Sequence, residues 1–253
     1  MFDFISKAFF KLFPQEPPTE ALNTAHRTFL QNKVTFYNQL NEDDKVHFES
    51  CCIAFIKVTQ FVGHETEVTD EDMLLVAAGS VILAWGFPRW HYVKVKTVIL
   101  VANAVGQDEH ATVTGMVGTH ELAGKMFLSK PALHYGFSND QDKRNVAIHE
   151  FAHLIDMADG EVDGLPEHLC KKAYVLPWLD LIKTKTHEIE QNKSNIRDYA
   201  AYNPAEFFAV TSEYFFERPK MLKQKHPKLY QSLQQFYKQD RAAVAEDINM
   251  SKK

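Results

Sequence analysis

The segment His149-Glu150-Phe151-Ala152-His153 constrains this chain more than any other feature of the sequence. Composition alone predicts far fewer than one copy of such a motif in a chain of 253 residues. The two histidines are four residues apart, so on a helix they share one face and both imidazoles can reach a single zinc ion. We expect a helix of about four turns here, ended by Gly160 and begun by residues with capping side chains, Ser138, Asn139 and Asp140.

Glu150 gives this motif a chemical meaning. A bound zinc ion lowers the pKa of its water toward about 7, and a carboxylate beside the ion can take the proton as the water attacks a carbonyl carbon. Catalytic zinc sites use three protein ligands, so two histidines leave the site one ligand short. The motif therefore predicts one zinc ion per chain and hydrolysis of peptide bonds, with Glu150 as general base and His149 and His153 as ligands. The alternative is that both histidines are core residues with ordinary hydrogen bonds.

One candidate for the third ligand follows the motif closely. Asp159 lies six residues after His153, where a metzincin-like motif places its last ligand. That motif also needs a glycine three residues after the second histidine so that the chain can turn, and Asp156 occupies this position. Asp156 is instead predicted to orient a ligand histidine or to close the loop that follows.

Glu206 is the favoured candidate, because it lies in the first turn of a second predicted helix. Asn203 can cap this helix and Pro204 suits its first position, while aromatic residues provide a packing face. Glu213 lies seven residues further on a similar face, so it is either a rival ligand or a hydrogen-bond partner of a ligand histidine. The structural alternative for Glu206 is a first-turn carboxylate that complements the helix dipole.

Residues 149–156, together with Tyr199 and residues 203–209, resemble the Mlc titration factor A family. Proteins of this family are bacterial zinc peptidases whose catalytic part is similar to the protease domain of anthrax lethal factor. The resemblance covers about residues 20–240. It implies that Glu206 is the third zinc ligand and that Tyr199, seven residues earlier, stabilises the oxyanion; Tyr202 is the alternative donor for that role.

The resemblance also implies an activity and a partner. The activity is that of an aminopeptidase acting on peptides. The partner is the transcriptional repressor Mlc, which such proteins sequester so that genes for glucose uptake are no longer repressed. The alternative is a non-catalytic regulator that binds a partner and keeps a vestigial or structural zinc site.

The hydrophobic pattern together with this resemblance predicts an α+β fold of the zincin-like type. Residues 20–84 are expected to be mainly helical, with one helix over 70–83, and residues 85–245 to form the catalytic part, with a small sheet before the zinc helix. A strand over 126–130 is predicted to border the cleft and to pair with an extended peptide through an exposed edge. Residues 1–19 are read as an N-terminal segment with a proline linker, and 246–253 as a tail.

Charge, hydropathy and cysteine count limit the classes of partner. The net charge is −5, and no block of Lys and Arg is interleaved with aromatic residues, so direct binding to nucleic acid is not expected. No run of about 18 apolar residues occurs, which argues against a transmembrane segment. Three cysteines, Cys51, Cys52 and Cys170, are too few for a disulfide framework and indicate a reducing compartment, so a cytoplasmic location is predicted.

Overall fold

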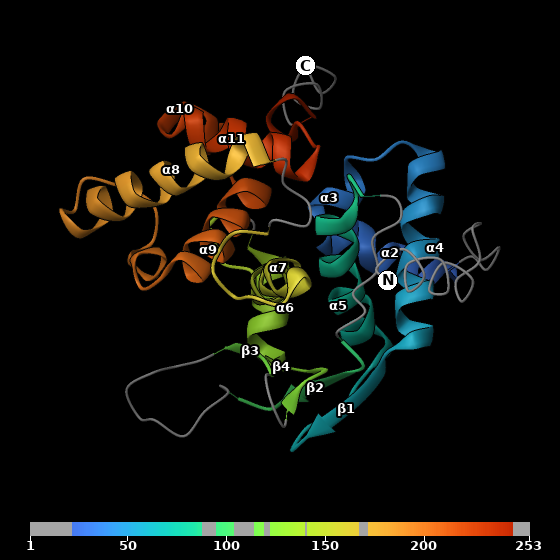
Figure 1. Ribbon diagram of the computed structural model, residues 1–253. Helices are drawn as coiled ribbons and strands as arrows, with labels where there is room; N and C mark the ends of the chain where they lie inside the picture. Colours follow the sequence, from blue (N-terminus) through green and yellow to red (C-terminus); the bar gives the residue numbers. More distant parts are fainter. Residues whose placement is uncertain are drawn as a thin grey trace, which may run out of the picture.

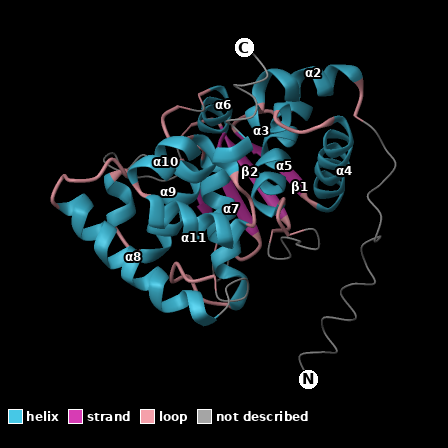
Figure 2. Ribbon diagram, turned by 90° about the horizontal axis from the view of Figure 1, so that it is seen from above, coloured by secondary structure: helices cyan, strands magenta, loops and turns pink. Residues whose placement is uncertain are grey.

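The computed structural model describes six stretches of the chain, residues 22–87, 95–103, 114–118, 122–139, 141–166 and 172–244. Within these stretches helices pack over a small mixed sheet, so the fold is α+β, as predicted. Figures 1 and 2 show the strands on one side of the molecule and the helices stacked above them. The predicted N-terminal segment 1–19 and tail 246–253 lie outside the described residues.

The first part of the described chain is mainly helical, with α2 (Thr24–Lys33), α3 (Thr35–Asn38), α4 (Glu42–Val58) and α5 (Asp70–Ala84). The helix predicted over 70–83 is confirmed as α5. Thr69 and Asp72 form a capping box at its start, which satisfies backbone N–H groups that have no partner within the helix. Most of α5 is buried, because it packs against α4 and against the helix that carries the histidine motif.

The sheet contains β1 (Gln60–His64), β2 (Thr97–Val101), β3 (Gly115–Val117) and β4 (Lys125–Ser129), in the order β1-β2-β4-β3. The pairs β1·β2 and β2·β4 are parallel, whereas β3 is antiparallel to β4. Alternate residues of β2 and β4 are buried, including the paired Leu100 and Leu128, so one face of the sheet contributes to the core. The sequence pattern does not predict β1, because this strand is mostly exposed and lacks a clear period-two pattern.

The prediction that the strand over 126–130 has an exposed edge is wrong. This strand is β4, and both of its edges are paired, one with β2 and the other with β3. The strand at this end of the sheet is β3, which packs against the helix of the histidine motif. Hydrophobic pattern identifies strands but carries no information on their order in a sheet, and the order decides which strand is the edge.

The predicted start of the motif helix is also wrong. Ser138 ends a separate helix, α6 (Lys130–Ser138), and the motif helix is α7 (Val146–Asp156), capped by the side chain of Asn145. Lys143 adopts a left-handed backbone conformation with φ 64°, which breaks the helical path between α6 and α7. The predicted end is confirmed, because α7 continues into a 3-10 turn, η2 (Met157–Asp159), that stops at Gly160 with φ 115°.

The rest of the described chain is helical, with α8 (Lys172–Glu190), the 3-10 turn η3 (Asp198–Ala201), α9 (Pro204–Glu217), α10 (Pro219–Lys225) and α11 (Pro227–Tyr237). Figure 1 shows α7 between α9 and α5, and both helices pack against it. Gly79 of α5 permits the close approach, since a Cβ there would lie 2.7 Å from the Cβ of Ala147. Phe151 of α7 is fully buried, and truncation of such a side chain costs about 3–5 kcal/mol.

The predictions about membrane spans and disulfides can be compared with the described residues. Among them, no helix is both long and apolar enough to cross a membrane. Cys51 and Cys52 are free thiols, while Cys170 lies outside the described residues.

The elements of residues 20–84 share the sheet and core of residues 85–245, since β1 pairs with β2 and α5 packs on α7.

Candidate metal centre

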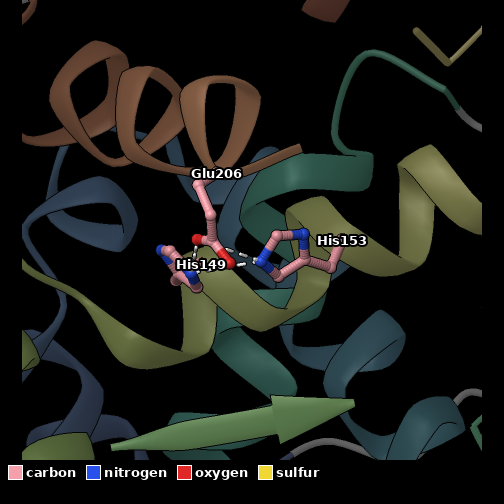
Figure 3. A group of neighbouring side chains, drawn as sticks. All are labelled: His149, His153 and Glu206. Atoms are coloured by element: carbon pink, nitrogen blue, oxygen red, sulfur yellow. Dashed lines mark hydrogen bonds and ion pairs between the residues drawn. The ribbon is translucent and has the colours of Figure 1, made fainter. Parts of the chain in front are cut away.

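His149 and His153 project from one face of α7 toward the start of α9 (Figure 3). Their Nε2 atoms are 3.2 Å apart, and the two rings meet edge to face. The side chains are 12% and 13% exposed, so solvent reaches the pair but does not surround it. The four-residue spacing of the motif thus brings two nitrogen donors to one point, as the helical period requires.

Glu206 reaches the same point from α9. The side chain of Asn203 caps this helix by accepting a hydrogen bond from the Glu206 backbone N–H at 2.8 Å, and Pro204 takes the first helical position. Glu206 Oε2 lies 3.1 Å from His149 Nε2 and 3.5 Å from His153 Nε2. Within the described residues, these three side chains form the group whose donor atoms lie within 4.8 Å of one another.

The donor set fits a zinc ion. Ligands at about 2.0–2.1 Å from a tetrahedral ion lie about 3.3–3.4 Å from one another, and the distances among the two Nε2 atoms and Glu206 Oε2 are 3.1, 3.2 and 3.5 Å. Glu206 Oε2 is buried yet makes no well-aligned hydrogen bond to the described residues, as expected of an atom facing a cation. Two histidines and one glutamate form a set typical of catalytic zinc, which leaves a fourth position for water.

The charges around this point favour a cation. Burial opposes a charge on His149, but the carboxylates of Glu213 and Glu206 outweigh it and raise the pKa of His149 to about 10. Burial likewise opposes ionisation of Glu206, yet the two histidines next to its carboxylate hold its pKa well below the usual range. The same carboxylates that stabilise a protonated imidazole would stabilise a metal ion, which then replaces the proton.

Glu150 lies on α7 beside His149 and is 3% exposed. Burial raises its pKa, while the neighbouring His149 and His153 act in the opposite direction. A carboxylate with a raised pKa is a stronger base, so the environment of Glu150 suits proton transfer.

Glu213 of α9 contacts the back of His149 rather than the metal position. Its Oε1 accepts from His149 Nδ1 at 2.8 Å and from the guanidinium of Arg197, and its Oε2 accepts from the backbone N–H of Asn145 at 2.7 Å. The bond to Nδ1 turns Nε2 toward Glu206. Of the two roles considered from sequence, Glu213 therefore has the geometry of the hydrogen-bond partner. Sequence reasoning missed Asn145 and Arg197; the capping position before α7 could have indicated Asn145, whereas no local signal marks Arg197.

Asp156 is fully buried at the end of α7, and its Oδ2 accepts from the backbone N–H of Gly164 at 2.9 Å. Gly164 in turn accepts a hydrogen bond from Trp178 Nε1 at 2.8 Å, and a Cβ at this glycine would lie 2.2 Å from the carbonyl oxygen of Pro204. Asp156 thus closes the loop after the motif and holds it against the start of α9. Burial raises the pKa of Asp156 to about 6.

Asp159, the metzincin-like candidate, lies elsewhere. It is exposed in η2, its Oδ1 accepts from the backbone N–H of Glu161 at 3.2 Å, and it does not belong to the three-residue donor group.

Tyr199 of the η3 turn lies beside the donor group, and Tyr202 is the C-cap of that turn. The ring of Tyr199 is 6.0 Å from the ring of His149, and burial together with the Glu206 carboxylate raises the pKa of Tyr199 to about 12. Its hydroxyl is therefore protonated at neutral pH and can donate a hydrogen bond. Tyr202 stacks on Tyr199, with 6.2 Å between the two ring centroids, and is the more exposed of the two tyrosines.

The edge strand β3 runs directly over Glu150. A Cβ added to Gly115 would lie 2.5 Å from Glu150 Oε1 and 2.6 Å from Val146 Cγ2, so only glycine permits this approach. Within the described residues, β3 pairs with β4 alone, and its other edge has no strand partner. The edge next to the metal position is thus β3, not the strand expected from sequence.

An α+β fold with two helical histidines, a carboxylate from a following helix and a buried glutamate beside them defines a site of the metallopeptidase class. The comparison of the sequence with family models agrees. The model described as glucose-regulated metallo-peptidase M90 matches residues 15–238, and this chain belongs to that family.

Several relatives share this similarity. The uncharacterized protein slr2042 of Synechocystis sp. is 30% identical over 227 residues, which cover 83% of this chain and 82% of the relative. The Mlc titration factor A of Pectobacterium atrosepticum is 36% identical over 104 residues, or 38% of each chain. That of Salmonella arizonae is 37% identical over 111 residues, or 41% of this chain and 43% of the relative. The alignments with the two Mlc titration factors thus span less than half of those proteins.

Proposed function

We propose that this chain is a zincin-like zinc peptidase, with His149, His153 and Glu206 as the zinc ligands. The observation that carries the proposal is the convergence of two Nε2 atoms and one carboxylate oxygen at tetrahedral spacing, with a buried carboxylate, Glu150, next to them. Membership of a metallopeptidase family supports it. Aminopeptidase activity is the finer part of the proposal and rests on the family resemblance.

The mechanism assigns one task to each side chain. The zinc ion, when bound, supplies Lewis acidity that polarises the scissile carbonyl group and acidifies a water molecule. Glu150 takes the proton of the attacking water and later delivers it to the leaving amine. Tyr199 donates its hydroxyl proton in a hydrogen bond to the developing oxyanion. Glu213 keeps His149 in the orientation that presents Nε2 to the ion.

The substrate class follows from the edge of the sheet. Among the described residues no strand pairs with the second edge of β3, and an extended peptide can pair with the backbone N–H and C=O groups of such an edge beside Glu150. Gly115 supports this role, because its lack of a side chain brings the backbone within contact distance of the proposed base. A peptide bound along β3 would thus lie with its backbone next to the metal position.

A second proposal concerns a protein partner. Relatives named Mlc titration factor A align with part of this chain, so we propose that it also binds an Mlc-type repressor and thereby affects genes for glucose uptake. We propose that the protein binds the repressor in the cytoplasm, in keeping with the free thiols of Cys51 and Cys52. We also propose that it does not contact nucleic acid directly. A regulator whose zinc site is vestigial or structural is the competing function.

One experiment tests the zinc peptidase. Zinc content is measured by elemental analysis on wild type, His149→Ala and Glu206→Ala, together with cleavage of aminoacyl and internally quenched peptides. We expect one zinc per wild-type chain, loss of zinc in both variants, and cleavage that a chelator abolishes. Retention of zinc by Glu206→Ala would remove Glu206 from the ligand set. Zinc binding without any cleavage would favour the non-catalytic regulator.

A Glu150→Gln variant separates catalysis from partner binding. Hydrolysis should be lost, because the amide cannot accept the proton, while zinc content and repressor binding stay at wild-type levels. Loss of repressor binding in this variant would contradict a docking surface separate from the catalytic centre.

A further inference from the structure

We propose that Tyr202 determines specificity, by providing an aromatic platform for a large apolar or aromatic side chain of the peptide, one or two residues from the cleaved bond. The proposal rests on the peptidase function and names the substrate class of that same site. It starts from a row of three rings, His149, Tyr199 and Tyr202, that leads outward from the metal position.

Tyr202 is the most exposed large hydrophobic side chain among the described residues, at 77%, and it lies at the outer end of this row. Its ring is nearly parallel to that of Tyr199, with an interplanar angle of 13°. One face of the Tyr202 ring is therefore stacked toward Tyr199. Tyr199 itself is 51% exposed. Two stacked and exposed tyrosine rings thus lie next to His149, a proposed zinc ligand, with Tyr199 in contact with it and Tyr202 beyond.

The backbone around Tyr202 is fixed to the proposed catalytic residues. The Tyr202 backbone N–H donates to the carbonyl oxygen of Tyr199 at 3.2 Å, which closes the η3 turn. The next residue, Asn203, caps α9 through the backbone N–H of Glu206. Tyr202 therefore has a set position relative to Glu206, and a side chain bound on it would have a set position relative to the reacting carbonyl group.

The distances suit a neighbour of the cleaved bond. Successive rings in the row are 6.0 and 6.2 Å apart, and each residue of an extended peptide spans about 3.3–3.6 Å. The Tyr202 ring therefore lies at most about 12 Å from the His149 ring, a distance that one or two residues of extended backbone and the length of a large side chain can span together.

Large apolar and aromatic side chains of the peptide gain the most binding free energy on the Tyr202 ring. A tyrosine loses little conformational entropy on binding, and stacking with another ring adds to the burial of apolar surface. Arginine or lysine could use the ring face as cations, but exposed cation–π contacts are weak. A short side chain such as alanine would leave the ring largely uncovered.

The test compares zinc-loaded wild type, Tyr202→Ala and Tyr202→Phe on quenched peptides that vary one residue at a time on either side of the cleaved bond, with Phe, Leu, Ala, Arg or Glu. We expect wild type to prefer Phe and Leu over Ala at one of these positions by about 10-fold in kcat/KM. Tyr202→Ala should lose most of this preference, chiefly through KM, whereas Tyr202→Phe should keep it. Tyr135→Ala is the matched control, because Tyr135 on α6 is also exposed, at 54%, and should leave the preference unchanged.

Three outcomes would overturn the platform. They are an unchanged preference in Tyr202→Ala, a wild-type preference for Arg, and a uniform loss of activity in Tyr202→Phe, which would indicate that the hydroxyl acts on the oxyanion. If wild type cleaves no peptide, the peptidase proposal has failed, and the platform is then tested alone by binding of the same peptides. Without cleavage, Tyr202→Ala should still bind Phe peptides about 10-fold more weakly than wild type does, and equal binding would reject the platform.

Discussion

Replacing Glu213 with glutamine should weaken zinc binding although Glu213 does not face the metal position. In the structure one carboxylate serves three donors: His149 Nδ1, the guanidinium of Arg197 and the backbone N–H of Asn145. An amide of the same size has one acceptor oxygen, so its NH₂ group must face at least one of these donors. The negative charge that supports His149 is removed as well.

The expected magnitude follows from these contacts. Loss of an outer hydrogen-bond partner of a metal ligand typically lowers metal affinity 10- to 100-fold, so the zinc dissociation constant should rise by about that factor, or about 1.4–2.8 kcal/mol. The zinc-free variant should also lose about 2 kcal/mol of unfolding free energy, because the side chain of Glu213 is only 3% exposed and bonds to a charged partner.

The assay is competition for zinc with a chromophoric chelator, combined with urea unfolding of the zinc-free proteins. Glu217→Gln is the matched control. Glu217 lies one turn further along α9, and burial raises its pKa to about 9, so at neutral pH it is mostly a neutral acid that glutamine imitates. Wild-type zinc affinity in Glu213→Gln, or an equal loss in both variants, would refute the assignment of Glu213 as the partner of His149.

Three further predictions address other parts of the site. Burial raises the pKa of Asp156 from 3.8 to about 6, so its ionisation opposes folding as pH rises through this range. Zinc-free Asp156→Asn should therefore be more stable than wild type at pH 8, by up to about 3 kcal/mol, and no more stable near pH 3; a gain that does not vary with pH in urea titrations would contradict this. Tyr199→Phe should keep its zinc and lose about 10²–10³-fold in kcat, and a rate equal to wild type would remove Tyr199 from catalysis. Gly115→Ala should keep zinc but lower kcat/KM at least about 10-fold, because its Cβ would meet Glu150 Oε1, whereas Met116→Ala on the same strand should not; equal rates in the two variants would show that β3 does not crowd the base.

Local patterns of the sequence were enough to locate several elements. The apolar pattern predicts α5, whose first turn the structure shows to be capped by Thr69 and Asp72, and Asn203 followed by Pro204 predicts the start of α9. These signals act within one helical turn, so they hold whatever the rest of the chain does. The start of α7 was misplaced for a related reason, since Ser138 and Asn139 also look like caps, and the left-handed turn at Lys143 leaves no mark in the apolar pattern.

Contacts between distant segments cannot be predicted from local sequence patterns. The order β1-β2-β4-β3 makes β3 the edge strand over Glu150, and nothing in the composition of residues 126–130 reveals that β4 is enclosed. Arg197 meets Glu213 only because η3 packs against α9 and α8.

The spacing of His149 and His153 is enough to predict that they lie together, because the helical period places them on one face in any fold that keeps α7 helical. Which carboxylate joins them depends on how distant segments pack, since Asp159, Glu206 and Glu213 are all present in the chain. Packing of α9 against α7 brings Glu206 to the Nε2 atoms and Glu213 to Nδ1, while η2 leaves Asp159 exposed. The physical reason is that helix geometry is set by short-range hydrogen bonds, whereas the approach of two helices depends on the fit of their buried side chains.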